Sequence, residues 1–284
     1  MDPPTVARRL FAPIAPSYER WASILSMGQD ARWRRALVTL LDPPMGASTL
    51  DVAAGTGSIT RLVDERGCRV IALDQSLAML ARHRGGLGVP VAATAERLPF
   101  PDGSFDVITF GYLLRYVDDV PGALAELARV VRSGGQLGMV EFGLPTGVWR
   151  PLWWLYTRTV LPISGALIGS GWGEVGQFLG HSIEGFARTW PPERLAATWE
   201  SAGLDEVGFR RLSLGGGLVM WGAIAYTFAV MWQLNSRLKG TPPEAAGAET
   251  VAMLGRWGRL HAGRTMIGLA ATALYAAGVY RALT

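Results

Sequence analysis

Short apolar segments alternate with amphipathic segments along the central part of the chain. The apolar segments have the length of strands and lie at residues 49–53, 69–73, 89–92, 105–110 and 136–142. Segments with helical periodicity lie at residues 58–66, 76–84, 119–131 and 192–202. Strands that alternate with helices are typical of a parallel sheet with helices on both faces. We therefore predict an α/β fold with a doubly wound, mostly parallel sheet, whose ligand site lies at the carboxyl ends of the strands.

Two further apolar segments follow Gly203 and would complete this sheet. Residues 207–214 and 218–225 are joined by three consecutive glycines at 215–217, which predicts a hairpin and a total of seven strands. Residues 1–44 are predicted as amphipathic helices with a break at 26–28. These helices either pack on a face of the sheet or form a flap over the ligand, with Tyr18 and Asp30 pointing inward.

The turn after the first strand favours a ligand of the nucleotide type. Gly55 and Gly57 let the backbone turn tightly and approach a ligand without a Cβ in the way. Asp74 ends the second strand about 20 residues further on. At this position in nucleotide-binding folds, an acidic residue accepts hydrogen bonds from the ribose hydroxyls. Thr60 follows where a dinucleotide fingerprint would have its third glycine. The turn therefore disfavours NAD and favours a smaller adenosyl ligand, with S-adenosylmethionine as the leading candidate.

Composition narrows the class of protein. The chain has 284 residues, of which 49% are hydrophobic, and this is enough for one substantial core with an appendage. Its net charge is +4, but the basic residues are scattered, which disfavours a nucleic-acid partner. Cys68 is the only cysteine, so no disulfide within the chain is expected. The start of the sequence lacks the pattern of a signal peptide, and we expect a cytoplasmic protein without a metal site.

The C-terminal part is more apolar than a small enzyme requires. Residues 218–234 and 265–280 are apolar over stretches close to the lower limit of a membrane span. The first must supply a hairpin strand, and a spanning hairpin would place five basic residues in its external loop, against the positive-inside rule. Val251, Leu254, Trp257 and Leu260 share one face of a basic amphipathic helix. We expect contact with the inner surface of the cytoplasmic membrane, or packing in a homo-oligomer, rather than crossing.

Several motifs carry a resemblance to a known family. Residues 95–106, 114–119, 129–135 and 140–142 resemble segments of class I methyltransferases. Together with Tyr18, residues 33–35 and residues 182–183, they resemble the ubiquinone/menaquinone biosynthesis C-methyltransferase family over roughly residues 10–225. The resemblance implies a Rossmann-like methyltransferase domain at residues 1–228, with a helical flap at 1–44 and a lid insertion at 145–190. Residues 229–284 extend beyond the resemblance and are predicted as an apolar helical appendage.

The resemblance also implies how S-adenosylmethionine is bound. Thr56 would lie beside the methionine part of the cofactor, and Asp74 would accept both ribose hydroxyls. Thr94 and Ala95 would meet the adenine, and Gly111 would lie on the far side of the cofactor. The complete set of expected cofactor-binding residues is Asp51, Ala54, Gly55, Thr56, Gly57, Asp74, Gln75, Thr94, Ala95, Glu96 and Gly111.

The reaction that the resemblance implies is methylation of a carbon atom on a prenylated hydroquinone. Arg115 could hold a water or a developing oxyanion, Tyr116 could relay a proton, and His181 could act as the base. Each has a structural alternative, since Arg115 could pair with Asp118 or Asp119 and His181 could cap a helix. The apolar residues 148–172 are predicted either as a lid over an apolar substrate or, equally, as an extra layer of the hydrophobic core.

Two other functions stay open at this stage. Leu113 and Tyr116 depart from residues that are common in the family, and both lie at the substrate end of the pocket. These departures favour a natural-product C- or O-methyltransferase that acts on another apolar small molecule. A third hypothesis, from a different class, is a membrane-associated scaffold that binds the cofactor without turnover.

Overall fold

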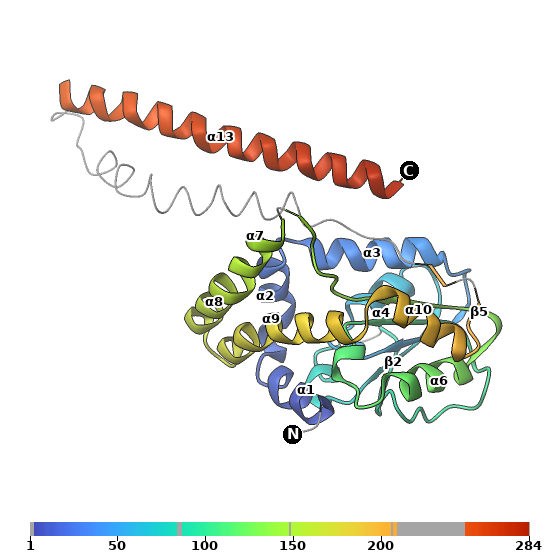
Figure 1. Ribbon diagram of the computed structural model, residues 1–284. Helices are drawn as coiled ribbons and strands as arrows, with labels where there is room; N and C mark the ends of the chain where they lie inside the picture. Colours follow the sequence, from blue (N-terminus) through green and yellow to red (C-terminus); the bar gives the residue numbers. More distant parts are fainter. Residues whose placement is uncertain (1–2, 84–86, 148, 206, 209–247, 284) are drawn as a thin grey trace. The chain divides into compact units, whose positions relative to one another are not determined.

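The computed structural model describes residues 3–83, 87–147, 149–205, 207–208 and 248–283, and the chain forms two compact units, Met1–Phe209 and Arg210–Thr284 (Figure 1). The first unit holds a sheet of five parallel strands in the order β3-β2-β1-β4-β5. These strands are β1 (Ser48–Val52), β2 (Arg69–Asp74), β3 (Val89–Ala92), β4 (Phe105–Gly111) and β5 (Val131–Val140). The predicted parallel α/β fold is therefore confirmed. The predicted hairpin at 207–225 lies almost entirely outside the described residues.

The order of the sheet reverses between β1 and β4. Leu50 of β1 lies opposite Ile71 of β2 on one side and opposite Ile108 of β4 on the other. The connection that leaves β1 therefore runs toward one edge of the sheet, and the connection that leaves β4 runs toward the other. Open α/β sheets bind their ligands in the crevice that such a reversal leaves at the carboxyl ends of the strands.

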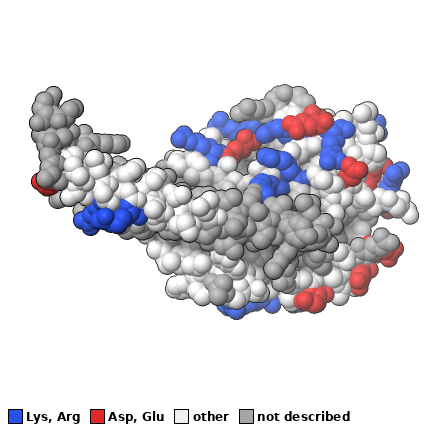
Figure 2. Space-filling model, turned by 90° about the horizontal axis from the view of Figure 1, so that it is seen from above, with Lys and Arg blue, Asp and Glu red and all other residues white. Residues whose placement is uncertain are grey.

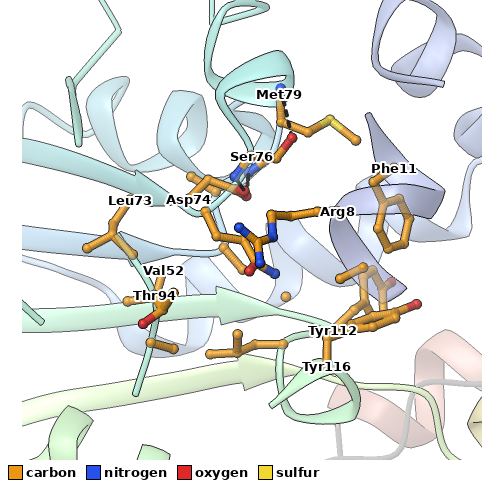
Figure 3. A pocket seen from close by; sticks show the side chains of 18 of the residues that line it. Arg8, Phe11, Val52, Leu73, Asp74, Ser76, Met79, Thr94, Tyr112 and Tyr116 are labelled. Atoms are coloured by element: carbon orange, nitrogen blue, oxygen red, sulfur yellow. Dashed lines mark hydrogen bonds between the residues drawn. The ribbon is translucent and has the colours of Figure 1, made fainter. Parts of the chain in front are cut away.

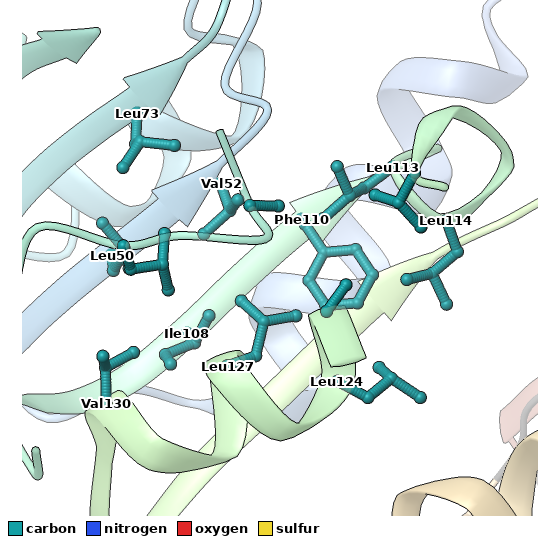
Figure 4. Close-up of a cluster of buried hydrophobic side chains, with 14 of the residues drawn as sticks. Leu50, Val52, Leu73, Ile108, Phe110, Leu113, Leu114, Leu124, Leu127 and Val130 are labelled. Atoms are coloured by element: carbon teal, nitrogen blue, oxygen red, sulfur yellow. The ribbon is translucent and has the colours of Figure 1, made fainter. Parts of the chain in front are cut away.

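Helices cover both faces of this sheet. On one face, Leu124 and Leu127 of α6 (Val120–Val130) are fully buried against Phe110 (Figure 4). The ring of Trp199 from α10 (Pro192–Ser201) also stacks on Phe110, with the centroids 6.1 Å apart. On the other face lie α3 (Gln29–Leu41) and α4 (Ser58–Asp64). A Cβ at Gly138 of β5 would lie 2.8 Å from methyl carbons of α3, so this glycine permits the close approach of the helix.

The helix after β2 is shorter than the pattern predicts. The sequence predicts a helix over residues 76–84, whereas α5 spans Leu77–Leu80. Ser76 caps its start, because the Ser76 hydroxyl oxygen accepts a hydrogen bond from the backbone N–H of Met79 at 3.4 Å. The predicted start of β5 at residue 136 is also corrected, to Val131, because Val131 already pairs with Phe105 of β4 and an irregularity separates this pair from that of Gln136 with Val107.

The N-terminal helices form a second core with residues 156–189. The elements involved are α1 (Pro3–Phe11), η1 (Ala15–Ser17), α2 (Tyr18–Leu25), a π-helical turn (Tyr156–Val160), α8 (Leu161–Ile168) and α9 (Trp172–Thr189). The short helix α7 (Trp149–Leu155) precedes the π-helical turn. Leu10, Ile14 and Leu161 are buried together in this core. The indole N–H of Trp172 donates to the hydroxyl of Ser17 at 3.0 Å. Two segments separated by over a hundred residues therefore pack as one helical layer.

The second unit contains α13 (Ala248–Leu283), which includes the predicted amphipathic segment. Val251 and Leu254 are exposed on this helix, as are Arg256 and Arg259. On the face of the molecule shown in Figure 2, basic and acidic side chains of the first unit are interspersed. Among the helices in the described parts of the chain, none combines the length and the apolar character that a membrane crossing requires.

A buried carboxylate ties the central strands together. Asp51 of β1 is 1% exposed and accepts hydrogen bonds from the hydroxyls of Thr60 on α4, at 2.6 Å, and Thr109 on β4, at 3.0 Å. Burial raises the pKa of Asp51 from 3.8 to about 6, although both hydroxyl bonds act in the opposite direction. Asp51 thus joins three elements beneath the crevice.

This environment predicts a pH-dependent stability. Because the pKa of Asp51 is raised in the folded state, the protonated form of Asp51 adds its full contribution to the free energy of unfolding at low pH. That contribution is lost as pH rises through about 6. The shift corresponds to about 3 kcal/mol. The Asn side chain of Asp51→Asn cannot ionise. The free energy of unfolding of this variant, relative to that of wild type, should therefore be higher at about pH 8 than at about pH 4 by about 2–3 kcal/mol. Urea unfolding across this range measures the difference.

Asp102→Asn is the matched control for this measurement, because the Asp102 side chain is 82% exposed. Its stability should follow wild type across the pH range. If Asp51→Asn also ran parallel to wild type, the pKa of Asp51 would lie near its ordinary value.

Candidate active site

A pocket lies in the crevice at the carboxyl ends of β1, β2 and β4. Its floor comes from the strand ends and the turn after β1, and its outer wall comes from α1, α2 and α3. Figure 3 shows Asp74, Ser76 and Met79 toward one end of this pocket and Phe11, Tyr112 and Tyr116 toward the other. The side chain of Arg8 reaches from α1 into the space between the two groups. The pocket therefore has a polar end and an aromatic end.

The turn after β1 is held against β2 by hydrogen bonds to Asp74. One carboxylate oxygen of Asp74 accepts from the backbone N–H of Gly55 at 2.8 Å, and the other accepts from that of Ser76 at 2.7 Å. Gly55 has φ +59°, a left-handed conformation that glycine adopts without strain. Burial raises the pKa of Asp74 against the effect of these two bonds. Since a carboxylate has about four acceptor positions, Asp74 can still accept from ligand hydroxyls.

A buried polar atom in the polar end has no protein partner. The side-chain oxygen of Gln75, which lines the pocket, accepts no hydrogen bond within the described part of the chain. Buried polar atoms are almost always paired in native proteins. Gln75 and Asp74 therefore fit a ligand with hydroxyl and amine donors at this end, which an adenosyl group with an amino-acid part provides.

Most of the predicted cofactor residues line this pocket. They are Ala54, Gly55, Asp74, Gln75, Thr94, Ala95, Glu96 and Gly111. Asp51 lies beneath the pocket in the contacts described above. Thr56 and Gly57 are outside the pocket lining, and a Cβ at Gly57 would lie 2.7 Å from the ring of His83. Gly57, with φ +88°, is thus required by the turn and by His83.

Aromatic rings form the other end. Phe11 of α1 meets Tyr116 edge-to-face at 5.4 Å, and Tyr116 stacks with Phe178 of α9 at 6.1 Å. Tyr18 lies beside Phe11 at 6.1 Å and stacks on Trp172. Tyr18 lines the pocket, as the flap hypothesis expected, and Asp30 lies behind it in contact with Tyr112. This end suits a flat apolar ring.

Arg115 lies behind the aromatic end and pairs with an acid that the sequence did not indicate. Its guanidinium donates to Glu141 at 2.9 Å, and the two side chains are 2% and 8% exposed. It also donates to the hydroxyls of Tyr116, at 3.3 Å, and Ser182, at 3.2 Å. The partner is therefore Glu141 at the end of β5, not Asp118 or Asp119. Of this group, Tyr116 lines the pocket, so Arg115 acts on the pocket through Tyr116.

His181 lies apart from the pocket. It is exposed on α9, where its ring contacts the guanidinium of Arg158 and lies 3.3 Å from the carbonyl oxygen of Gln177. The structure thus brings Tyr116 and Arg115 together at the substrate end and leaves His181 on the outer surface.

The pocket residues that were missed at the sequence level include Arg8, Arg34, Met79 and Tyr112. Arg34 and Met79 follow a helical pattern and are indistinguishable from packing residues in the sequence. Tyr112 immediately follows the end of β4, which is a signal that could have been used. Its backbone φ of +60° is rare for a residue with a Cβ, and the sequence does not reveal it.

Comparison with protein-family models identifies the family of this chain. The ubiE/COQ5 methyltransferase family model matches residues 4–224, which is most of the chain. The chain belongs to this family. It is therefore a methyltransferase, and S-adenosylmethionine is its cofactor, which supplies an electrophilic methyl group on a sulfonium. The polar end of the pocket, with Asp74 and Gln75, fits this cofactor.

Curated relatives agree over the same region. A protein of Tropheryma whipplei (strain Twist) named demethylmenaquinone methyltransferase is 38% identical over 212 residues, which cover 73% of this chain and 87% of the relative. A protein of the same name from Corynebacterium kroppenstedtii is 38% identical over 221 residues, with 76% and 92% covered. One similar solved structure, titled a possible histamine N-methyltransferase of Thermotoga maritima, is 21% identical with a TM-score of 0.47 and covers 70% of this chain and 81% of that one.

A second family model matches the C-terminal part. The anthrone oxygenase model matches residues 194–274, which overlap the end of the first match and include most of the chain beyond it. Of the matched residues, the structure describes α10, a few residues after it and the first part of α13.

The contacts of Asp74 predict a loss of cofactor affinity on substitution. Asp74→Asn removes the charge that ribose hydroxyls would meet, and each hydrogen bond to a charged group is worth about 1.5–3 kcal/mol. The Kd for S-adenosylmethionine should rise about 10–100-fold by calorimetry. Thermal unfolding should be followed in parallel, because the introduced amide has a single oxygen and cannot accept from both backbone N–H groups in the same way. A Kd within about twofold of wild type would remove Asp74 from the cofactor site.

The Arg115 cluster predicts a different result. Arg115→Lys keeps a charge beside Glu141 but cannot reach Tyr116 and Ser182 in the same geometry, so turnover should fall while cofactor affinity holds. Arg115→Met leaves Glu141 buried without its partner and should cost about 3–5 kcal/mol of stability. Steady-state kinetics and thermal unfolding of both variants separate the two effects. If Arg115→Lys lost stability, affinity and turnover together, Arg115 would be a structural ion-pair residue only.

Proposed function

We propose that the protein methylates a ring carbon of a prenylated hydroquinone, such as demethylmenaquinol, at the aromatic end of the pocket. The observation that carries this proposal is the identity of 37–38% with several curated proteins named demethylmenaquinone methyltransferase, each covered over more than four-fifths of its length. The aromatic wall of Phe11, Tyr18 and Tyr116 supports it, because a flat apolar ring packs well on such a wall.

The role of the protein in this reaction is mainly alignment. Transfer of a methyl group from a sulfonium is an in-line displacement, so the ring carbon must face the methyl group at close to contact distance. In this proposal Asp74 and Gln75 fix the cofactor, and Phe11 and Tyr116 fix the plane of the ring. Arg115 holds the hydroxyl of Tyr116 in place and adds a fixed positive charge behind the developing negative charge on the substrate oxygen.

The prenyl chain of such a substrate would place the enzyme near lipid. Val251, at 70%, and Met266, at 66%, are among the exposed apolar residues of α13, beside the exposed Arg256 and Arg259. Exposed apolar side chains next to basic ones suit an anionic lipid surface. We infer that residues 229–284 form an appendage that brings the cytoplasmic enzyme to the membrane surface, with association of two copies as the alternative.

A second candidate substrate is a polycyclic hydroxylated aromatic of a natural-product pathway. The match of residues 194–274 to the anthrone oxygenase model favours it, because anthrones are fused-ring ketones that tautomerise to phenols. Leu113 and Tyr116, which differ from residues common in the family, line the substrate end of the pocket and would shape it for such a ring.

A direct comparison of substrates tests both candidates. The full chain, with S-adenosylmethionine, is given demethylmenaquinol in anionic liposomes or an anthrone, and methylated product is measured by mass spectrometry. We expect kcat/KM for demethylmenaquinol to be higher by about tenfold or more. A preference for the anthrone would support the second candidate. Cofactor binding by calorimetry with no product from either would support the scaffold without turnover.

A further inference from the structure

Tyr112 has a backbone conformation that must be maintained by its surroundings. It follows directly after β4 and has φ +60°, which is uncommon for a residue with a Cβ and costs of order 1–3 kcal/mol. Its backbone N–H donates to the carbonyl oxygen of Val140 at 2.8 Å, which fixes the turn against β5. Such strained residues cluster at functional sites.

The side chain of Tyr112 is held just as firmly. Its ring stacks on Phe142 with the centroids 4.4 Å apart and the planes 15° from parallel. Its hydroxyl donates to a carboxylate oxygen of Asp30, on α3, at 2.8 Å. The same oxygen accepts from the guanidinium of Arg34 at 2.9 Å. Tyr112 is one of the pocket residues, and its phenol is locked onto a carboxylate that belongs to the N-terminal helices.

Burial and the negative charge of Asp30 raise the pKa of Tyr112 well above its ordinary value of 10. The phenol therefore stays protonated and donates its hydrogen to Asp30. Its oxygen keeps lone pairs that can accept a second hydrogen bond. Other titratable or charged groups near this phenol are Arg34 and Tyr18, which act on its charge, and Arg115, whose guanidinium lies 5.9 Å from the ring centre and pairs with Glu141.

Asp30 connects this phenol with solvent. The Asp30 side chain is 16% exposed, whereas that of its partner Arg34 is 8% exposed. A proton that reaches Asp30 from the pocket can therefore pass on to water. The hydrogen-bonded chain therefore runs from the Tyr112 oxygen to Asp30, which is partly exposed at the surface.

We propose that Tyr112 and Asp30 form a proton relay that removes the proton of the substrate hydroxyl during methyl transfer. The proposal rests on the proposed function, since it requires a hydroxylated ring at the aromatic end of the pocket. In this relay the Tyr112 oxygen meets the substrate hydroxyl, which makes Tyr112 the catalytic residue. Asp30 is a positioning residue and the final acceptor within the protein.

The step balances without an additional reactant. The ring carbon forms its bond to the methyl group while the S–CH₃ bond breaks, and that electron pair stays on sulfur. As the ring gives up electron density, its hydroxyl becomes strongly acidic, and the hydroxyl proton moves to the Tyr112 oxygen while the Tyr112 proton moves to Asp30. The resulting keto form transfers its ring C–H proton to oxygen and becomes aromatic again. One proton leaves through Asp30 for each methyl group transferred.

Other acids and bases near the pocket are less suited to this role. Arg115 stays protonated and can only donate. Asp74 already accepts two backbone hydrogen bonds at the cofactor end, and Glu96 accepts from the backbone N–H of Asp118 at 3.3 Å. His181 is exposed on α9 outside the pocket lining.

Tyr112→Phe tests the relay, because it keeps the ring and its stacking on Phe142 and removes only the hydroxyl. A positioned base contributes about 10²–10⁴-fold, so kcat near neutral pH should fall about 100-fold. The Kd for S-adenosylmethionine should stay within about twofold. The deficit should shrink as pH rises toward about 10, where a phenolic substrate ionises without help. A purely structural role would give a deficit that is independent of pH.

Asp30→Asn should show the same pH-dependent deficit, and the double variant should be no worse than either single one, because both residues serve one path. Tyr156→Phe is the matched control: it also loses a buried tyrosine hydroxyl, the one that donates to the carbonyl oxygen of Leu25, but outside the pocket lining. Its kcat should follow wild type at every pH, and its thermal unfolding calibrates the stability cost of one lost hydroxyl.

Tyr112→Phe with kcat near wild type, or with a deficit that runs parallel to wild type across pH, would overturn the relay while the proposed function stands. Wild type that methylates no hydroxylated ring would overturn the proposed function, and the relay with it. The two failures are thus distinguished by the wild-type activity measured in the same assay.

Discussion

The site depends on the buried carboxylate of Asp51 at the point where the order of the sheet reverses. Its two oxygens join β1 to β4 through Thr109 and to α4 through Thr60. The turn after β1 leads directly into α4, and Tyr112 directly follows β4. The hydrogen bonds of Asp51 therefore help to position both ends of the pocket. A buried acid with two hydroxyl partners is costly to ionise, but it fixes geometry, because few other arrangements satisfy its oxygens.

The sequence predicted those parts of the fold and site that rest on local patterns. The five strands were recognised because each is a short apolar segment, and Asp74 was recognised because a glycine turn and the next strand end occur at a fixed spacing. The start of β5 was placed five residues late, because Arg132 and Ser133 do not look like strand residues. They lie in the irregular stretch between Val131, which pairs with Phe105 of β4, and Gln136, which pairs with Val107.

Pairings between distant residues could not be predicted in the same way. Arg115 pairs with Glu141, 26 residues away, although Asp118 and Asp119 are much closer in the sequence. The contact of Tyr112 with Asp30 spans 82 residues and depends on the left-handed backbone of Tyr112. Residues 1–44 raised two interpretations, packing and flap. In the structure α3 packs on the sheet through Leu37, while Tyr18 and Arg34 line the pocket and Asp30 does not; the flap over the cofactor stays a prediction.

The charges at the substrate end suit the chemistry of methyl transfer. Arg34 is paired with Asp30, and Arg115 is paired with Glu141, so each buried cation beside the ring is matched by a carboxylate. Such a site stays nearly neutral, which is compatible with an uncharged apolar ring and with a cationic sulfonium. The reaction converts that cation into a neutral thioether, and its positive charge must leave as a proton. In the proposed relay this proton departs through Asp30, whose side chain is 16% exposed.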